Sequence, residues 1–164
     1  MCIRDSLAVP TFTSHDAVRY IWDGAATLAG YDPYFYSPQG IRAALPLWTV
    51  PTDNAGYVTL YPPLALCLFV LSALAGPSAA PWLWRVLVFG ASAATLLVGS
   101  RSLARCRCER HAALLAFSPP LVFEAGVGLH VDVFAALAVA CALLAFGANR
   151  PARAAACLAL GALV

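Results

Sequence analysis

The feature that most constrains this chain is the predominantly apolar stretch from Pro81 to Ser100. It is about 20 residues long, which is enough for a helix to cross the hydrocarbon core of a bilayer. A cluster of arginines follows it directly: Arg101, Arg105, Arg107 and Arg110. Because basic residues gather in cytoplasmic loops, the pattern predicts a membrane helix whose C-terminal end faces the cytoplasm.

Composition extends this prediction to the whole chain. Charged residues make up 11% and hydrophobic residues 62%, whereas soluble domains are typically about 25% charged. We therefore expect an all-α fold, a polytopic transmembrane helical bundle, with membrane helices at residues 64–76, 81–100, 111–126, 131–147 and 154–164. The net charge of +2 and the lack of a basic run interleaved with aromatic residues argue against a nucleic-acid partner.

The two basic loops constrain the topology. If residues 101–110 and 149–153 are both cytoplasmic, only one crossing can lie between residues 60 and 101. The shorter apolar run, 64–76, then fits a short helix that re-enters or lies in the membrane. The competing topology has this run span fully and places the arginine cluster outside, against the charge bias.

Both ends of the chain suggest a fragment. Residues 1–10 are expected to combine two parts: Met1 to Ser6 resembles translated adaptor sequence, and Leu7 to Pro10 is interpreted as the end of a lost first membrane helix. The last apolar run, 154–164, is too short to span a bilayer. We expect the N-terminal fragment of a larger, multi-pass protein of the bacterial inner (plasma) membrane, and we expect the fragment alone to be inactive.

Residues 11–60 are predicted to form a loop outside the membrane. Four aspartates, Asp16, Asp23, Asp32 and Asp53, outnumber the two arginines in this segment. By the positive-inside rule the loop faces away from the cytoplasm. Its aromatic, proline-punctuated segment 31–40 is typical of a turn region at the lipid headgroups.

An amphipathic, juxtamembrane helix is predicted at residues 14–29 of this loop. Thr13 or Ser14 can cap its first turn and Gly30 can end its last. Spacing of i, i+3, i+4 and i+7 places four polar side chains on one face. These are Asp16, Arg19, Tyr20 and Asp23, and the apolar face holds Val18, Ile21, Ala25 and Leu28.

The polar face suggests chemistry. The Asp16 carboxylate could accept a proton from a substrate hydroxyl, and Arg19 could hold an anionic group such as a phosphate. Alternatively, Asp16 belongs to a capping box and complements the helix dipole. That alternative does not explain why Arg19, Tyr20 and Asp23 continue the same face.

Glu124, His130 and Asp132 form a second polar group. Prolines before this group and glycines within it interrupt the helix, and irregular backbone at membrane depth is tolerated where it lines a cavity. His130 and Asp132 could bind a metal together with Glu124 or Asp16, or could form hydrogen bonds with a sugar. Alternatively they lie at the water interface. We predict that no metal or other cofactor is needed, and we leave open the possibility of a divalent ion.

Other motifs are weak or absent. Cys106 and Cys108 with His111 lack the usual spacing of a zinc site. There is no P-loop and no Gly-x-Ser-x-Gly motif, which argues against nucleotide hydrolysis and a serine hydrolase.

Four sequence blocks together resemble the bacterial mannosyltransferase-like branch of the GT-C integral-membrane glycosyltransferases. The blocks are His15-Asp16-Ala17-Val18-Arg19-Tyr20-Ile21-Trp22-Asp23-Gly24, Gly30-Tyr31-Asp32-Pro33-Tyr34, Tyr61-Pro62-Pro63-Leu64-Ala65, and Ser118-Pro119-Pro120-Leu121-Val122-Phe123-Glu124 with Gly128-Leu129-His130-Val131-Asp132. They cover most of residues 13–135. Family members differ at His15, at Pro119 and at residues 127–129.

The resemblance implies a membrane enzyme that transfers a hexose from a polyprenyl-phosphate sugar donor, and the mannosyltransferase-like branch implies that this hexose is mannose. The acceptor would be a glycan or lipid-linked glycan on the extracytoplasmic side, in the cell envelope, and the anomeric carbon would be inverted. Asp16 would be the general base. Arg19, Tyr20 and Asp23 would bind the donor or substrate, Tyr61 would shape the donor's entry, and Glu124, His130 and Asp132 would form a second polar wall.

Two other classes of function remain open. A membrane transporter would also place acids and broken helices near cavities, but it should show internal repeats, which this chain lacks. A non-catalytic membrane subunit of envelope glycan assembly would need no polar face at residues 16–23.

Overall fold

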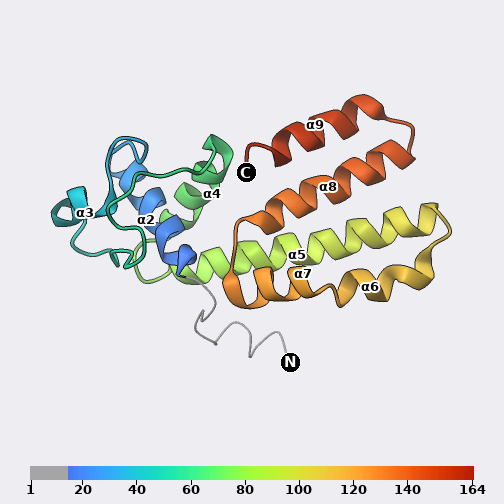
Figure 1. Ribbon diagram of the computed structural model, residues 1–164, viewed down its shortest axis with the longest axis horizontal. Helices are drawn as coiled ribbons and strands as arrows, with labels where there is room; N and C mark the ends of the chain where they lie inside the picture. The colour runs from blue at the N-terminus through green and yellow to red at the C-terminus, as the bar shows by residue number, and fades with distance from the viewer. Residues whose placement is uncertain (1–14) are drawn as a thin grey trace. The chain divides into compact units, whose positions relative to one another are not determined.

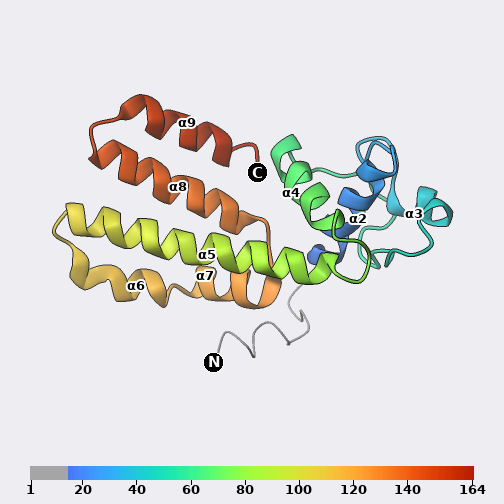
Figure 2. The same ribbon diagram turned by 180° about the vertical axis from the view of Figure 1, so that it is seen from behind.

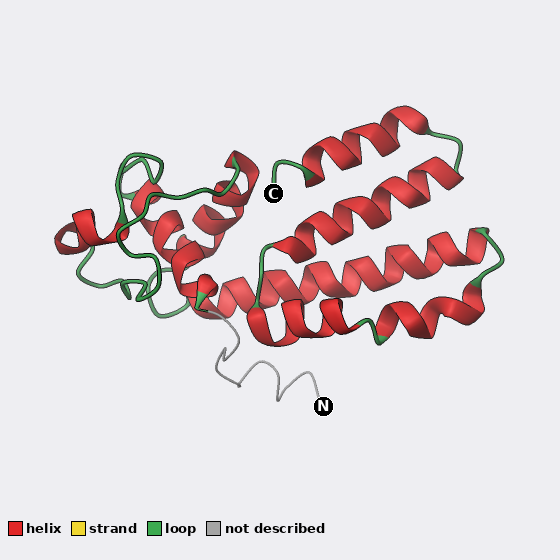
Figure 3. Ribbon diagram, in the orientation of Figure 1, coloured by secondary structure: helices red, strands yellow, loops and turns green. Residues whose placement is uncertain are grey.

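A computed structural model describes residues 15–164, and every regular element in this range is helical (Figures 1 and 3). This confirms the all-α expectation. The expectations for residues 1–10, and the caps expected at Thr13 and Ser14, lie outside the described residues. The chain divides into an N-terminal unit, residues up to 86 with residues 127–129, and a C-terminal unit, residues 87–126 with 130–164. Each is described by itself.

Helix α2 spans Asp16–Leu28, close to the predicted range, and His15 before it makes no capping hydrogen bond through its side chain. Gly30 ends the helix as expected, with φ of +85°. The Gly30 N–H donates to the Thr27 carbonyl at 3.0 Å, and the Tyr31 N–H donates to the Ala26 carbonyl at 2.9 Å. This is a Schellman arrangement, which favours glycine at the left-handed position.

Helix α4, Pro63–Ala73, packs against α2, and the two lie side by side in both views (Figures 1 and 2). Pro63 suits the first turn because its missing N–H would have no helical partner there. The packing is closest at Gly24, where an added Cβ would overlap the Phe69 carbonyl group. Glycine is therefore required for this helix pair to approach.

The loop between α2 and α4 has its own small core. Helix α3, Pro38–Ile41, is capped by the Ser37 side chain, which accepts from the Gly40 N–H at 3.4 Å. A 3₁₀ turn, Arg42–Ala44, follows. Ile41 and Leu45 pack with Trp22 of α2, and Trp48 covers this cluster. The predicted loop is thus folded against the helix.

Helix α5, Ala80–Arg105, has 26 residues. Within the described residues it is the one helix long and apolar enough to cross a membrane; α4 and α8 are shorter apolar helices. A helix of sufficient length and hydropathy is therefore present where the span at 81–100 was predicted, extended by about one further turn. The multi-pass arrangement of the rest of the chain stays a prediction.

The predicted apolar segment 111–126 is broken into pieces. A 3₁₀ turn, Glu109–His111, leads into α6, Ala112–Ala116, and then into α7, Pro119–Phe123, and a π-helical turn, Glu124–Gly128. The break falls at Ser118-Pro119, where the prolines predicted it, because a proline removes a backbone donor and restricts the preceding residue.

Helices α8, Asp132–Gly147, and α9, Pro151–Gly161, complete the C-terminal unit. They run side by side in opposite directions (Figures 1 and 2). Gly161 allows the approach, since an added Cβ would lie 2.9 Å from the Cβ of Ala138. The Arg105 guanidinium at the end of α5 donates to the Leu144 carbonyl of α8 at 3.0 Å.

Candidate functional site

The polar face of α2 is buried although it carries charged groups. Tyr20 and Asp23 are each 1% exposed and Arg19 is 7% exposed. On the predicted apolar face Ala25 is also buried, at 2%, whereas Leu28 at the end of the helix is 45% exposed. Asp16, at the start of the helix, is half-buried. Burying charged groups is costly unless they are paired and hydrogen-bonded. The contacts of these side chains therefore decide what the face can do.

Arg19 is paired and hydrogen-bonded from all three guanidinium nitrogens. Its Nε donates to Asp23 Oδ1 at 2.9 Å, one helical turn along α2. The two terminal nitrogens donate to the carbonyls of Asn54 at 3.0 Å and of Tyr57 at 2.9 Å. The planar fork of arginine suits such a set of acceptors. Arg19 therefore connects α2 to the loop before α4. The expectation that Arg19 binds a phosphate group stays a prediction.

Asp23 has one satisfied and one unsatisfied carboxylate oxygen. Oδ1 accepts from Arg19, while Oδ2 is buried without a hydrogen-bond partner among the described residues. Burial raises the pKa of Asp23 above its ordinary value of 3.8. The positive charge of Arg19 and the nearby Thr59 hydroxyl act in the opposite direction and lower this pKa. Removal from water therefore outweighs the attraction of Arg19 in setting this pKa.

Tyr61 completes the group. Its ring lies edge to face against the rings of Tyr20 and Phe69, with distances between ring centroids of 5.1 Å and 5.3 Å. Burial raises the pKa of Tyr61 above 10.0; a hydrogen bond with Tyr20 lowers it, and the nearby charge of Asp16 raises it. The N-terminal unit thus brings together five of the eight predicted site residues: Asp16, Arg19, Tyr20, Asp23 and Tyr61.

A segment that we call the strap, residues 53–61, connects these residues to the rest of the unit. His15 and Asp53 form an exposed pair with 2.9 Å between Nδ1 and Oδ2. The Thr59 N–H donates to the Pro33 carbonyl at 2.9 Å, and the Tyr34 hydroxyl donates to the Tyr61 carbonyl at 2.6 Å. With the two bonds from Arg19, the strap is fastened along its whole length.

The other three predicted residues gather in the C-terminal unit. His130 Nδ1 lies 3.3 Å from Glu124 Oε2 and 3.9 Å from Asp132 Oδ2. The His130 N–H also donates to the Glu124 carbonyl at 2.9 Å, which closes the chain around the π-helical turn. Glu124 is 46% and Asp132 77% exposed in their side chains. The expectation that all eight residues line one site stays a prediction, because the two groups belong to different units.

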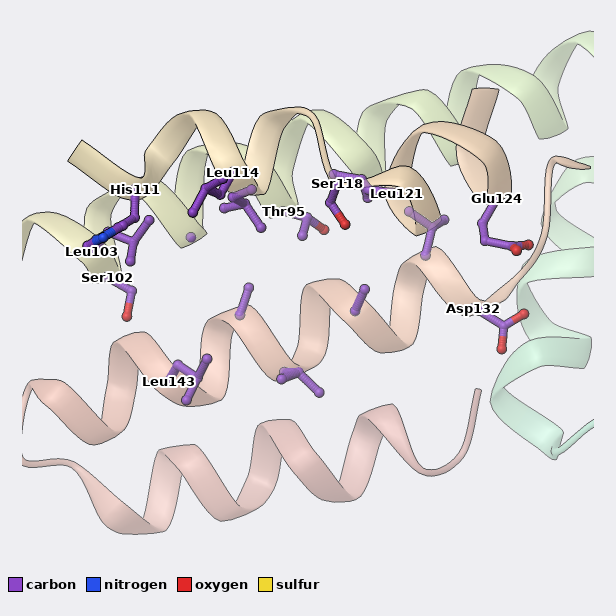
Figure 4. A pocket seen from close by; sticks show the side chains of 16 residues that line it. Thr95, Ser102, Leu103, His111, Leu114, Ser118, Leu121, Glu124, Asp132 and Leu143 are labelled. Carbon is purple, nitrogen blue, oxygen red and sulfur yellow. The ribbon is translucent and has the colours of Figure 1, made fainter. Parts of the chain in front are cut away.

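Glu124 and Asp132 lie at one end of a groove in the C-terminal unit (Figure 4). The groove has a volume of about 700 Å³ and runs between α5, α6, α7 and α8. Ser102 and His111 lie toward its other end, and leucine side chains line its middle. The groove is thus lined mainly by apolar side chains, with the hydroxyls of Thr95 and Ser118 along its length and further polar groups at both ends.

Among residues 15–164, no group of three or more His, Cys, Asp or Glu side chains is arranged to hold a metal ion. Cys106 and Cys108 are free thiols, and the Cys108 thiol donates to the Cys106 carbonyl at 3.4 Å.

Sequence reasoning missed three residues that shape the group around Tyr20. Phe69 stacks on Tyr20 at 4.7 Å, and the fully buried Trp84 meets it edge to face at 5.3 Å. The Tyr34 hydroxyl donates a hydrogen bond to the Tyr61 carbonyl. Tyr34 lies in the aromatic segment 31–40, for which the sequence predicts a position at the lipid headgroups. Phe69 and Trp84 lie in apolar runs, where helical spacing does not distinguish a site neighbour from a core residue.

Comparison with known proteins adds no relationship: no family model, no curated protein and no solved structure matches this chain.

Proposed function

We propose that this protein is a multi-pass membrane glycosyltransferase that transfers a hexose, mannose in the first instance, from a polyprenyl-phosphate sugar donor. The acceptor is a glycan or lipid-linked glycan outside the cytoplasmic membrane. The proposal rests on the sequence resemblance, and one structural observation supports it. Asp16, Tyr20 and Tyr61 converge at the start of α2, within a unit that continues into the apolar helix α5.

The chemistry follows from the side chains at this point. A half-buried carboxylate such as Asp16 can take the proton from an acceptor hydroxyl. The hydroxyl oxygen then bonds to the anomeric carbon from the side opposite the phosphate, which inverts that carbon. The bond between the anomeric carbon and the phosphate oxygen breaks, and polyprenyl phosphate leaves with the bonding electrons. The half-buried Tyr61 offers aromatic surface and a hydroxyl group to the sugar. The buried Tyr20 supports Tyr61 through ring packing and a hydrogen bond between their side chains.

Glu124, His130 and Asp132 are proposed to contact substrate in the C-terminal unit. Carboxylates accept hydrogen bonds from sugar hydroxyls, and an imidazole can donate or accept. Their moderate to high exposure leaves them accessible for such contacts.

Asp16→Asn tests the proposal. The protein, expressed from its complete reading frame, is assayed in membranes for transfer from a polyprenyl-phosphate mannose donor. Loss of a general base should lower the rate about 100-fold or more. Glu109→Gln, which changes an exposed acid of the C-terminal unit, should retain the wild-type rate. Transfer by Asp16→Asn at the wild-type rate would exclude Asp16 as the base.

A transporter remains the second candidate, because the groove beside a π-helical turn in the C-terminal unit is a feature that transporters share. Flux of lipid-linked sugar into vesicles that is the same with and without the wild-type protein would exclude the transporter. A non-catalytic subunit of envelope glycan assembly predicts no transfer by the purified wild-type protein with any acceptor.

A further inference from the structure

We infer that Arg19 and Asp23 are positioning residues: their ion pair fixes the strap, so that Tyr61 faces Tyr20 beside Asp16, and the donor phosphate binds elsewhere. The inference rests on the proposed function and assigns Arg19 a different role from the donor binding that the resemblance implies. It follows from where the polar atoms of the pair are directed.

The guanidinium group of Arg19 is committed to the protein. Three of its five N–H donors point at Asp23 Oδ1 and at the carbonyls of Asn54 and Tyr57. The side chain is 9% exposed. A phosphate oxygen could take these donors only if it displaced Asp23 or the two strap carbonyls, which would break the contact between α2 and the strap.

Asp23 holds the guanidinium in this orientation. It accepts from Nε, which leaves both terminal nitrogens free to reach the strap. It also supplies the negative charge that a buried guanidinium needs. Thr59 of the strap lies beside the same carboxylate and is 3% exposed. The ion pair therefore contacts the strap at three residues, Asn54, Tyr57 and Thr59.

Tyr61 is the residue that this arrangement positions. The strap ends at Tyr61, whose carbonyl accepts from Tyr34 at 2.6 Å and whose N–H donates to the Thr59 hydroxyl at 3.4 Å. Its ring then packs edge to face against both rings of the stacked pair Tyr20 and Phe69. Release of the strap from Arg19 would free Tyr61 to leave the vicinity of Asp16.

Amide hydrogen exchange of the purified protein gives the first test. Arg19→Lys keeps the charge but cannot form the three-way fork, and Asp23→Asn removes the acceptor charge. Each should raise exchange of the strap amides about tenfold or more, since a charge-assisted bond contributes more than a neutral one. Arg42→Lys, at an exposed arginine of the same loop, should leave strap exchange unchanged.

A neutral pair separates positioning from overall stability. In Arg19→Gln/Asp23→Asn no buried charge is left unpaired, so the thermal midpoint should recover toward the wild-type value. One amide group cannot hold both strap carbonyls, so strap exchange should stay fast and kcat for sugar transfer should stay low. If kcat recovered together with the midpoint, Arg19 and Asp23 would act only through stability, and the inference would fail.

Inhibition by sugar-free polyprenyl phosphate tests where the phosphate binds. If Arg19 only positions the strap, the inhibition constant should stay within about twofold of wild type in Arg19→Lys while kcat falls about tenfold, the effect of roughly 1.4 kcal/mol. Tyr34→Phe, which removes a strap contact distant from Arg19, should show the same pattern to a smaller extent. A tenfold weaker inhibitor in Arg19→Lys, with no change in Tyr34→Phe, would assign Arg19 to the phosphate and overturn the inference.

The exchange measurements need no enzymatic activity. If no sugar transfer is detected in the wild-type protein, the proposed function fails, while the strap contact is still decided by exchange. If the strap amides exchange at the wild-type rate in both single variants, the positioning role fails whatever the activity.

Discussion

Gly24 of α2 lies directly against the backbone of Phe69 in α4, with no room for a Cβ between the two helices. Phe69 in turn stacks on Tyr20, four residues before Gly24 on the same helix. The aromatic group that holds Tyr61 therefore depends on a close backbone contact between two helices.

Gly24→Ala should destabilise the N-terminal unit. The added methyl group would gain about 1 kcal/mol of helix propensity, but the overlap with the Phe69 carbonyl should cost about 1 to 3 kcal/mol or more, because backbone cannot move aside as a side chain can. Gly90→Ala in α5 is the matched control, since nothing lies within 4 Å of its added Cβ. Thermal unfolding in detergent, followed by tryptophan fluorescence, should show a lower midpoint for Gly24→Ala alone.

Trp84→Phe should loosen residues 127–129 from the N-terminal unit. The Trp84 indole N–H donates to the Leu129 carbonyl at 2.9 Å, and Trp84 is fully buried. Phenylalanine would leave that buried carbonyl without its donor, at a cost of about 1 to 3 kcal/mol. Faster amide exchange at residues 127–131 would show it. Trp82→Phe, at a position 53% exposed, should not change that exchange.

Asp23 should make stability fall as the pH rises. Its folded pKa is raised above the ordinary 3.8 by burial, so the folded state binds this proton more tightly than the unfolded state does. Its contribution is then fully present below pH 3.8 and is lost as the pH rises through the folded pKa. The thermal midpoint of wild type minus that of Asp23→Asn should decrease across this window. A difference that increases with pH would mean that attraction to Arg19 outweighs burial.

The proposed orientation predicts which side of the membrane Cys106 faces. Cys106 is an exposed, free thiol in the basic segment after α5. In a variant with Cys106 as its only cysteine, a membrane-impermeant maleimide should label inverted vesicles and should not label right-side-out vesicles. Labelling from the outer side would favour the competing topology, in which residues 64–76 span the membrane fully.

Local signals predicted the helices well. The expected helix at 14–29 is found at Asp16–Leu28, ending at Gly30, and the proline pair predicted the break before α7. Both depend on backbone rules that act within a few residues. The π-helical turn at Glu124–Gly128 has no comparable sequence signature, and we expected only an interruption there.

Tertiary contacts account for what the sequence did not reveal. Periodicity predicted that Arg19 and Asp23 share one face of the helix, which the structure confirms. It did not predict which part of the protein that face contacts. Its direction is set by carbonyls at Asn54 and Tyr57, more than thirty residues along the chain. Backbone acceptors exist at every position, so no residue type indicates which of them an arginine will reach.

Helix α5 is longer than the barrier that it is proposed to cross. Its 26 residues give a rod of about 39 Å at 1.5 Å per residue, against a hydrocarbon thickness of about 30 Å. Arg101 and Arg105 occupy the surplus at its C-terminal end. In a bilayer, guanidinium groups in the last turns of such a helix would resist movement inward, because each group would have to enter the hydrocarbon core. The proposed crossing would therefore have its depth set by Arg101 and Arg105.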